Sequence, residues 1–119
     1  MHSIDISVVI PTRNERENIE PLIARLSGTL PVGHAQVIFV DDSSDDTAAV
    51  IAKLAQTSAL PVLVLHREPG ERVGGLGGAV VAGLRLAEGR VAVVMDGDLT
   101  PLLDALAAVD RAERLAGGE

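Results

Sequence analysis

Four short apolar segments constrain the fold of this chain more than any other feature of its sequence. They span residues 8–10, 37–40, 60–65 and 91–95, and each is a continuous run rich in valine, isoleucine or leucine. Strands that are buried on both faces of a parallel sheet have this pattern, because helices cover both faces of such a sheet. All four segments are far shorter than the ~18–20 apolar residues that cross a bilayer, so we expect no membrane-spanning segment.

Helical patterns separate the four segments. The first covers residues 19–30, and Pro21 predicts that Asn18 caps this helix, because proline is tolerated only in the first turn. Three further helices are expected, starting within residues 44–47, near residue 75 and at residue 100. The apolar side of the second helix is Val50, Ile51, Leu54 and Ala55, and that of the third is Leu76, Ala79, Val80 and Leu84. The apolar side of the last helix is Leu102, Leu103, Leu106 and Val109. This alternation predicts an α/β fold, a three-layer α/β/α sandwich with a mainly parallel, Rossmann-like sheet in a single domain.

Polar residues gather directly after each apolar segment. They occupy residues 11–15, 41–46, 66–67 and 96–98. In doubly wound sheets, ligands bind beyond the carboxyl ends of the strands. We therefore expect these four groups to share one rim of the sheet and to form the functional site there.

Asp96 and Asp98 flank a glycine after the fourth apolar segment. A tight turn at Gly97 would direct both carboxylates at one point. Two hard oxygen ligands with open positions beside them suit Mg²⁺ or Mn²⁺, which usually binds substrate phosphate as well. The alternative is a turn whose acids only cap the helix that follows.

Asp41 and Asp42 end the second apolar segment, and we expect both to face the same crevice. A carboxylate in that position accepts hydrogen bonds from a nucleotide base or from ribose hydroxyls. The alternative is that these acids only stabilise the start of the next helix through its dipole. Asp45 and Asp46 are expected to have that role alone.

Arg13 and Arg67 are the cations best placed on this rim to bind a diphosphate, since an arginine fork pairs with phosphate oxygens in bidentate fashion. Either could instead be a solvated surface charge. His66 is expected to be a structural histidine. The glycine-rich residues 74–78 open the third helix, where phosphate contact and close packing are equally expected.

Composition excludes several classes of function. Seventeen acidic and ten basic residues give a net charge of −7, which disfavours nucleic acid and anionic membrane surfaces as electrostatic partners. Phe39 is the single aromatic residue, whereas stacking on unpaired bases requires several. The absence of cysteine excludes thiol catalysis and cysteine-ligated metal sites. No secretory signal precedes Asp5, so a cytoplasmic location is expected.

Five segments, taken together, resemble one family. They are VVIPTRNERENI, VIFVDDSSDDT, the arginine after VLVLH, GLGGAVVAGL and VMDGDLTP. In order and spacing they resemble the N-terminal half of family 2 inverting glycosyltransferases of the GT-A fold. The most similar subgroup is that of dolichol- or polyprenol-phosphate mannose synthases. The resemblance extends from Ile6 to Pro101.

The resemblance implies an enzyme that transfers a sugar, mannose or glucose, from a GDP- or UDP-linked donor to a polyprenyl or dolichyl phosphate with inversion. It implies that residues 1–119 are the nucleotide-sugar-binding part of a GT-A domain, truncated after the D-x-D motif. The acceptor-binding half would be absent, and the chain alone would not be fully active. A peripheral position at the inner face of the membrane is a further expectation, and an open sheet edge would permit a homodimer.

Carried over residue by residue, the resemblance implies that Pro11, Arg13 and Glu15 line the nucleoside pocket and that Asp42 contacts the base. The family often has an aromatic residue in place of Arg13, so here a guanidinium plane would stack on the nucleoside. The expected metal ligands and catalytic residues are Asp96 and Asp98, with Mg²⁺ or Mn²⁺ as the cofactor. The full set of expected nucleotide-sugar ligands is Pro11, Arg13, Glu15, Asp41, Asp42, Arg67, Asp96, Gly97 and Asp98.

Two other functions remain open. Residues 96–100 also fit the D-x-D-x-T motif of haloacid-dehalogenase-like phosphatases, in which the first aspartate attacks phosphate and the second transfers a proton. That motif normally lies on the first strand with a long domain behind it, whereas 19 residues follow Thr100 in this 119-residue chain. The other alternative is a non-catalytic chain that binds a nucleotide or pairs with another subunit.

Overall fold

The computed structural model describes residues 4–31 and 33–96, and in addition the single residues 104, 107, 108, 111 and 115. Strands and helices alternate along the chain, as the apolar segments predict. In chain order they are β1 (Ile6–Thr12), α1 (Arg16–Thr29), β2 (Ala35–Asp41), α2 (Thr47–Ala55), β3 (Val62–His66), the 3₁₀ turn η1 (Pro69–Glu71), α3 (Gly75–Leu86) and β4 (Val91–Val94).

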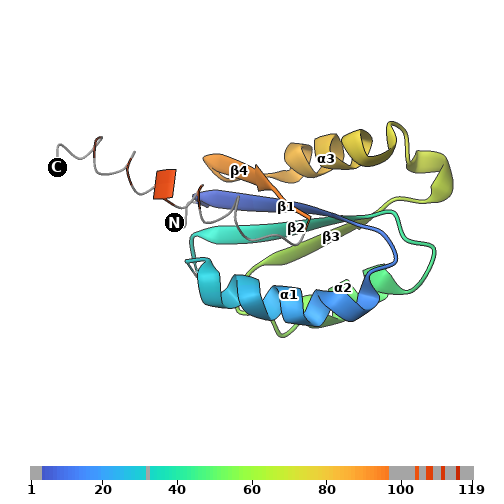
Figure 1. Ribbon diagram of the computed structural model, residues 1–119, viewed down its shortest axis with the longest axis horizontal. Helices are drawn as coiled ribbons and strands as arrows, with labels where there is room; N and C mark the ends of the chain where they lie inside the picture. Colours follow the sequence, from blue (N-terminus) through green and yellow to red (C-terminus); the bar gives the residue numbers. More distant parts are fainter. Residues whose placement is uncertain are drawn as a thin grey trace.

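The four strands form a parallel sheet in the order β3-β2-β1-β4. Val8 of β1 pairs with Val37 of β2 on one side and with Val93 of β4 on the other. Helices α1 and α2 cover one face of the sheet and α3 covers the other (Figure 1), which confirms the predicted three-layer sandwich. Right-handed crossovers account for this arrangement, because the chain moves from β1 to β3 over one face and returns to β4 over the opposite face.

Two apolar cores lie on the two faces of the sheet. The larger core lies under α1 and α2 and contains the fully buried Phe39. The smaller core lies under α3 and contains Val9, Ile38, Val40 and Ala79. Residues of β1 and β2 point alternately into one core or the other, so the central residues of both strands are apolar. The buried polar residues of these strands lie toward their ends and bond to one another, Ser7 to Gln36 and Thr12 to Asp41.

The first helix begins earlier than its proline predicts. It starts at Arg16 instead of after Asn18, so Pro21 lies inside the helix as its sixth residue. The N–H of Asn18 donates to the carbonyl of Glu15 (2.8 Å), which closes a first turn ahead of the proline. Pro21 is exposed, so water can bond the carbonyl that the proline leaves without its N–H donor.

The apolar side predicted for α3 is only partly correct. Ala79 is buried, but Leu76 is 70% exposed and Leu84 is 41% exposed. The helix instead faces the sheet with its small residues, Ala79 and Gly83. A Cβ atom at Gly83 would clash with Cγ1 of Val9, so the absence of a side chain lets α3 lie directly against β1.

The helix predicted from Thr100 lies largely outside the described residues, and so do Gly97, Asp98 and Pro101. The five single residues described after position 100 are helical and exposed. None of the helices in the described part of the chain is both long enough and apolar enough to cross a bilayer.

Candidate functional site

A cleft of about 410 Å³ opens at the carboxyl ends of β1 and β2, beside the first residues of α3. It is lined by Pro11, Thr12, Arg13, Glu15, Asp42, Arg72, Gly75, Leu76, Ala79 and Asp96. The order of the sheet explains its place. From β1 the chain proceeds outward to β2 on one side, whereas β4 lies on the other side, and ligand crevices form at such a switch point.

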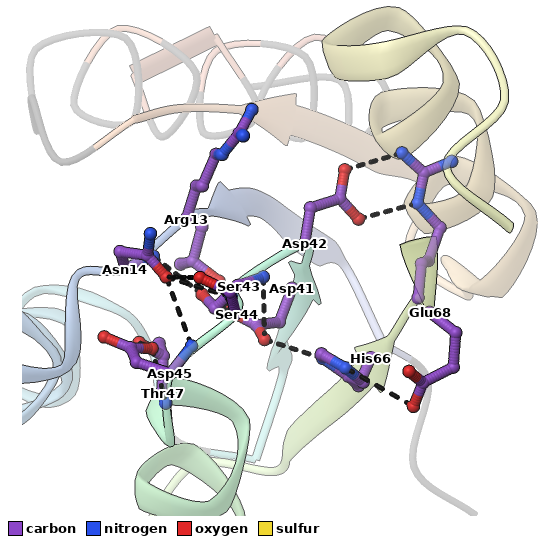
Figure 2. A network of polar contacts seen from close by, with 12 residues as sticks. Arg13, Asn14, Asp41, Asp42, Ser43, Ser44, Asp45, Thr47, His66 and Glu68 are labelled. Carbon is purple, nitrogen blue, oxygen red and sulfur yellow. Dashed lines mark hydrogen bonds and ion pairs between the residues drawn. The ribbon is translucent and has the colours of Figure 1, made fainter. Parts of the chain in front are cut away.

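The cleft brings together five of the nine predicted nucleotide-sugar ligands. They are Pro11, Arg13, Glu15, Asp42 and Asp96, which come from three different strand ends. Figure 2 shows the Arg13 side chain extending toward the same side as Asp42. Gly97 and Asp98 lie outside the described residues, and Asp41 and Arg67 are placed elsewhere.

Asp42 forms a bidentate ion pair with Arg67. Nε of Arg67 donates to Oδ1 at 2.8 Å and Nη2 donates to Oδ2 at 2.7 Å (Figure 2). These hydrogen bonds hold the pKa of the Asp42 carboxyl below its usual range, and the carboxylate in turn raises the pKa of Arg67. Asp42 is therefore an ionised acceptor with a fixed orientation at the edge of the cleft.

Arg67 is not a free cation on the rim, which differs from the expectation of a guanidinium available to a diphosphate. It is buried, with 7% of its surface exposed. Besides its bonds to Asp42, it donates to the carbonyls of Val73 (3.3 Å) and Gly75 (2.9 Å). All of these acceptors belong to the protein, so Arg67 fastens the start of α3 to the end of β2.

Asp41 does not face the cleft, which corrects the expectation that it shares a crevice with Asp42. Successive residues of a strand point to opposite faces, and Asp41 is fully buried on the side of α2. Its carboxylate accepts bonds from Oγ1 of Thr12 (2.7 Å), Oγ of Ser43 (2.6 Å) and Nδ1 of His66 (2.8 Å), and a longer one from the Ser43 N–H (3.3 Å). His66 thus has the structural position that its sequence context predicts.

The acids after Ser44 only partly follow their expected role. Oδ1 of Asp45 accepts the N–H of Thr47 (3.0 Å) at the start of α2, as a capping acid does. Asp46 precedes the helix without a side-chain capping bond and instead pairs with Arg16 at 2.9 Å on the exposed surface.

Arg72 was not predicted from the sequence, although it lines the cleft. Its Nε donates to the carbonyl of Arg67 and its Nη2 to the carbonyl of Ser43, both at 2.9 Å. The segment before it, η1, has no apolar periodicity, so no strand end marks the arginine as a rim residue. The nearby glycines at positions 74 and 75 were the available signal, because they mark the start of α3, and Gly75 lines the same cleft as Arg72.

The sequence profile of glycosyl transferase family 2 matches residues 7–112. The chain belongs to this family. A dolichol-phosphate mannosyltransferase of Pyrococcus furiosus is 42% identical over 94 residues, which make up 79% of this chain and 26% of that protein. The chain therefore spans about a quarter of this relative's length.

Two solved structures share the fold. The mannosyltransferase PcManGT from Pyrobaculum calidifontis, in complex with GDP-Man and Mn²⁺, superposes with a TM-score of 0.64 at 28% identity over 82% of this chain and 28% of that one. S. aureus TarS in complex with UDP-GlcNAc gives 0.71 at 28% identity over 91% of this chain and 32% of that one. The expected GT-A type of sheet is thereby confirmed.

The phosphatase alternative does not agree with these observations. Its nucleophile motif belongs on a first strand, whereas Asp96 follows β4, the last strand of the described sheet. The glycosyltransferase profile also covers the whole D-x-D-x-T segment. The D-x-D segment of this chain therefore lies within the family 2 match.

The cleft contains oxygen donors of the kind that a divalent cation prefers. Asp96 contributes a carboxylate to a cleft that also contains the carboxylates of Glu15 and Asp42, and Mg²⁺ and Mn²⁺ prefer such oxygen donors. In the part of the chain that the structure describes, no three acidic or histidine side chains lie close enough together to hold a metal by themselves. Asp96 would thus need Asp98 or a substrate phosphate as a further ligand.

Proposed function

We propose that residues 1–119 are the donor-binding part of a hexosyltransferase that moves mannose or glucose from a GDP- or UDP-linked sugar to a polyprenyl or dolichyl phosphate, with inversion. The observation that carries this proposal is the cleft itself, where Arg13, Asp42, Arg72 and Asp96 converge at the switch point of the sheet. The names of the relatives support the substrate classes, since they include a dolichol-phosphate mannosyltransferase and a complex with GDP-Man.

Each residue of the cleft has a role in this proposal. Asp42, ionised and held by Arg67, accepts hydrogen bonds from the base or the ribose. Arg13 and Arg72 offset the charge of the diphosphate, and Arg72 replaces Arg67 in the role expected from the sequence. Asp96 and Asp98 are the catalytic residues and would hold Mg²⁺ or Mn²⁺. Such an ion, when bound, stabilises the negative charge that the leaving nucleoside diphosphate gains.

The acceptor explains why the cleft needs no strong base. A lipid phosphate is already an anion, so its oxygen can attack the sugar without first losing a proton. The family relatives are much longer than the matched segment, and we assign acceptor binding to that additional length. The isolated chain should therefore bind the donor and transfer little sugar.

Location and assembly complete the proposal. We assign the protein to the cytoplasm, at the inner face of the membrane that contains the lipid acceptor. In the described part of the sheet, β3 and β4 are edge strands, and such edges permit self-association. The mass of the protein in solution tests whether it is a homodimer.

Thermal unfolding with nucleotides tests the donor site. We expect GDP or UDP to raise the melting temperature with Mn²⁺ or Mg²⁺, and we expect EDTA, Asp96→Ala or Asp98→Ala to abolish the rise. Asp5→Ala is the matched control, because Asp5 lies just before β1, at the amino end of the strands. Equal stabilisation in EDTA would contradict the metal role, and no stabilisation by any nucleotide would contradict the donor site. If the chain binds nucleotides without catalysing transfer, a chimera in which it replaces the matching segment of a full-length relative would show no sugar transfer.

A further inference from the structure

Ser43 links the two walls of the cleft, although it does not line the cleft itself. It follows Asp42 and is buried, with 2% of its surface exposed. Its Oγ–H donates to the buried carboxylate of Asp41 at 2.6 Å, and the same Oγ accepts the backbone N–H of Asn14 at 2.7 Å. The Ser43 hydroxyl thus connects the sheet interior to the loop that contains Arg13 and Asn14 (Figure 2).

The loop has a left-handed backbone conformation at Asn14. Its φ angle is 52°, and asparagine adopts this region more readily than most residues other than glycine. Its side-chain oxygen accepts the N–H groups of Ser44 (3.0 Å) and Asp45 (3.3 Å), so the loop is joined to the segment before α2 at several points. Among these points, only the bond to Ser43 continues into the buried Asp41 carboxylate.

The opposite wall depends on the same residue. The carbonyl of Ser43 accepts Nη2 of Arg72 at 2.9 Å, and Arg72 belongs to the segment that leads into α3. One residue therefore contacts the loop with Arg13 on one side and Arg72 on the other.

We propose that Ser43 is a positioning residue for the donor cleft, which acts through the Asn14 N–H to fix Arg13 and Glu15 opposite Asp42 and Arg72. The Asp41 carboxylate, with Thr12 and His66 as its other partners, is the rigid support of this contact. The consequence for nucleotide affinity rests on the function proposed above. The effect on the loop does not depend on that function.

Two adjacent serines provide the test. Ser43→Ala removes the hydroxyl that bridges Asp41 and Asn14. Ser44→Ala is the matched control, because the Ser44 hydroxyl is exposed and makes only a 3.4 Å contact with Asn14. In the 119-residue chain, we expect Ser43→Ala to weaken GDP or UDP binding about tenfold under conditions where the variant is fully folded, and Ser44→Ala to change it less than about twofold. Ser43→Thr keeps the hydroxyl and should recover most of the affinity.

Amide hydrogen exchange without nucleotide separates the loop from the function. We expect the Asn14 amide to exchange at least about tenfold faster in Ser43→Ala, and the amide resonances of Arg13 and Glu15 to shift, with neither change in Ser44→Ala. Unchanged exchange at Asn14 would overturn the proposal. Faster exchange with unchanged nucleotide affinity would also overturn it, because the hydroxyl would then have only a structural role. If the unmodified chain binds no nucleotide, the proposed function fails, and the exchange comparison still decides whether Ser43 holds the loop.

Discussion

Two neighbouring aspartates at the end of β2 have opposite surroundings. Asp41 is fully buried and is surrounded by Thr12, Ser43 and His66 on the side of α2. Asp42 lies at the edge of the cleft, where its carboxylate forms a bidentate ion pair with Arg67. The two residues have the same chemistry, and only the alternation of the strand separates them.

The difference shows that a pair of acids on a functional rim need not be a pair of ligands. The Asp41 carboxylate is bonded by hydroxyl, amide and imidazole groups of the protein, so it supports the loops around the cleft. Among the described residues, the Asp42 carboxylate is hydrogen-bonded to Arg67, and Asp42 lines the cleft. Substitutions at the two positions should therefore affect different properties, one mainly stability and the other mainly binding.

The largest effect is expected from Asp41→Ala. This change leaves the buried hydroxyls of Thr12 and Ser43 without their acceptor, and we expect a loss of about 3 kcal/mol in the free energy of unfolding. Urea unfolding measures it. Asp42→Ala should lower the stability less and should abolish nucleotide binding. Equal losses of stability in the two variants would contradict the contrast between the two acids.

A smaller effect is expected from Arg67→Lys. An ammonium group keeps the charge but cannot form the two parallel bonds to Asp42 or reach the carbonyls of Val73 and Gly75 at the same time. We expect a loss of about 1–2 kcal/mol in stability and about tenfold in nucleotide affinity, measured by urea unfolding and calorimetry. If Arg67 instead bound the diphosphate directly through its charge, Arg67→Lys would retain most of the nucleotide affinity, even though lysine cannot hold Asp42 in the same way.

The smallest effect is a change in how stability depends on pH. The pKa of Asp42 is lowered in the folded protein by Arg67, relative to about 4 in the unfolded chain. The pair therefore stabilises the protein fully above about pH 5, and this contribution is lost as the pH falls through the folded pKa. Asp42→Asn should reduce the decrease in stability between about pH 5 and pH 3, measured by urea unfolding at several pH values.

A surface pair is the control for the pH experiment. Arg16 and Asp46 pair at 2.9 Å with more than half of each side chain exposed, so solvent screens their attraction. Arg16→Gln should leave both the stability and its pH dependence unchanged. A change as large as that of Asp42→Asn would mean that acid sensitivity arises from the general surface charge.

The sequence predicted the layers and the rim well because both depend on local patterns. Continuous apolar runs mark strands such as β2, which is buried along its whole length, and the polar residues that follow them meet at one edge of the sheet. The predicted start of α1 was wrong. The N–H of Asn18 donates to the carbonyl of Glu15, and this bond closes a first helical turn that requires no N–H from Pro21.

The partners of the rim residues could not be predicted in the same way. Arg67 and Asp42 are 25 residues apart in sequence, and only the pairing of β2 with β3 brings them together. The sequence alone does not distinguish an arginine that binds phosphate from an arginine that pairs with a carboxylate of the protein. The opposite directions of Asp41 and Asp42, by contrast, could have been predicted from the two-residue period of a strand.

The contact of Gly83 with Val9 has a consequence for engineering of the proposed donor cleft. Because α3 lies directly on β1 at this point, the helix cannot move inward, and a larger residue at position 83 would push it outward together with Gly75 and Ala79. Leu76 belongs to the same wall but is 70% exposed, so it can be shortened or lengthened without repacking the interior. If the cleft binds a sugar nucleotide as proposed, efforts to admit a bulkier or smaller one should begin with the side chain at position 76 and leave the backbone of the helix where it is.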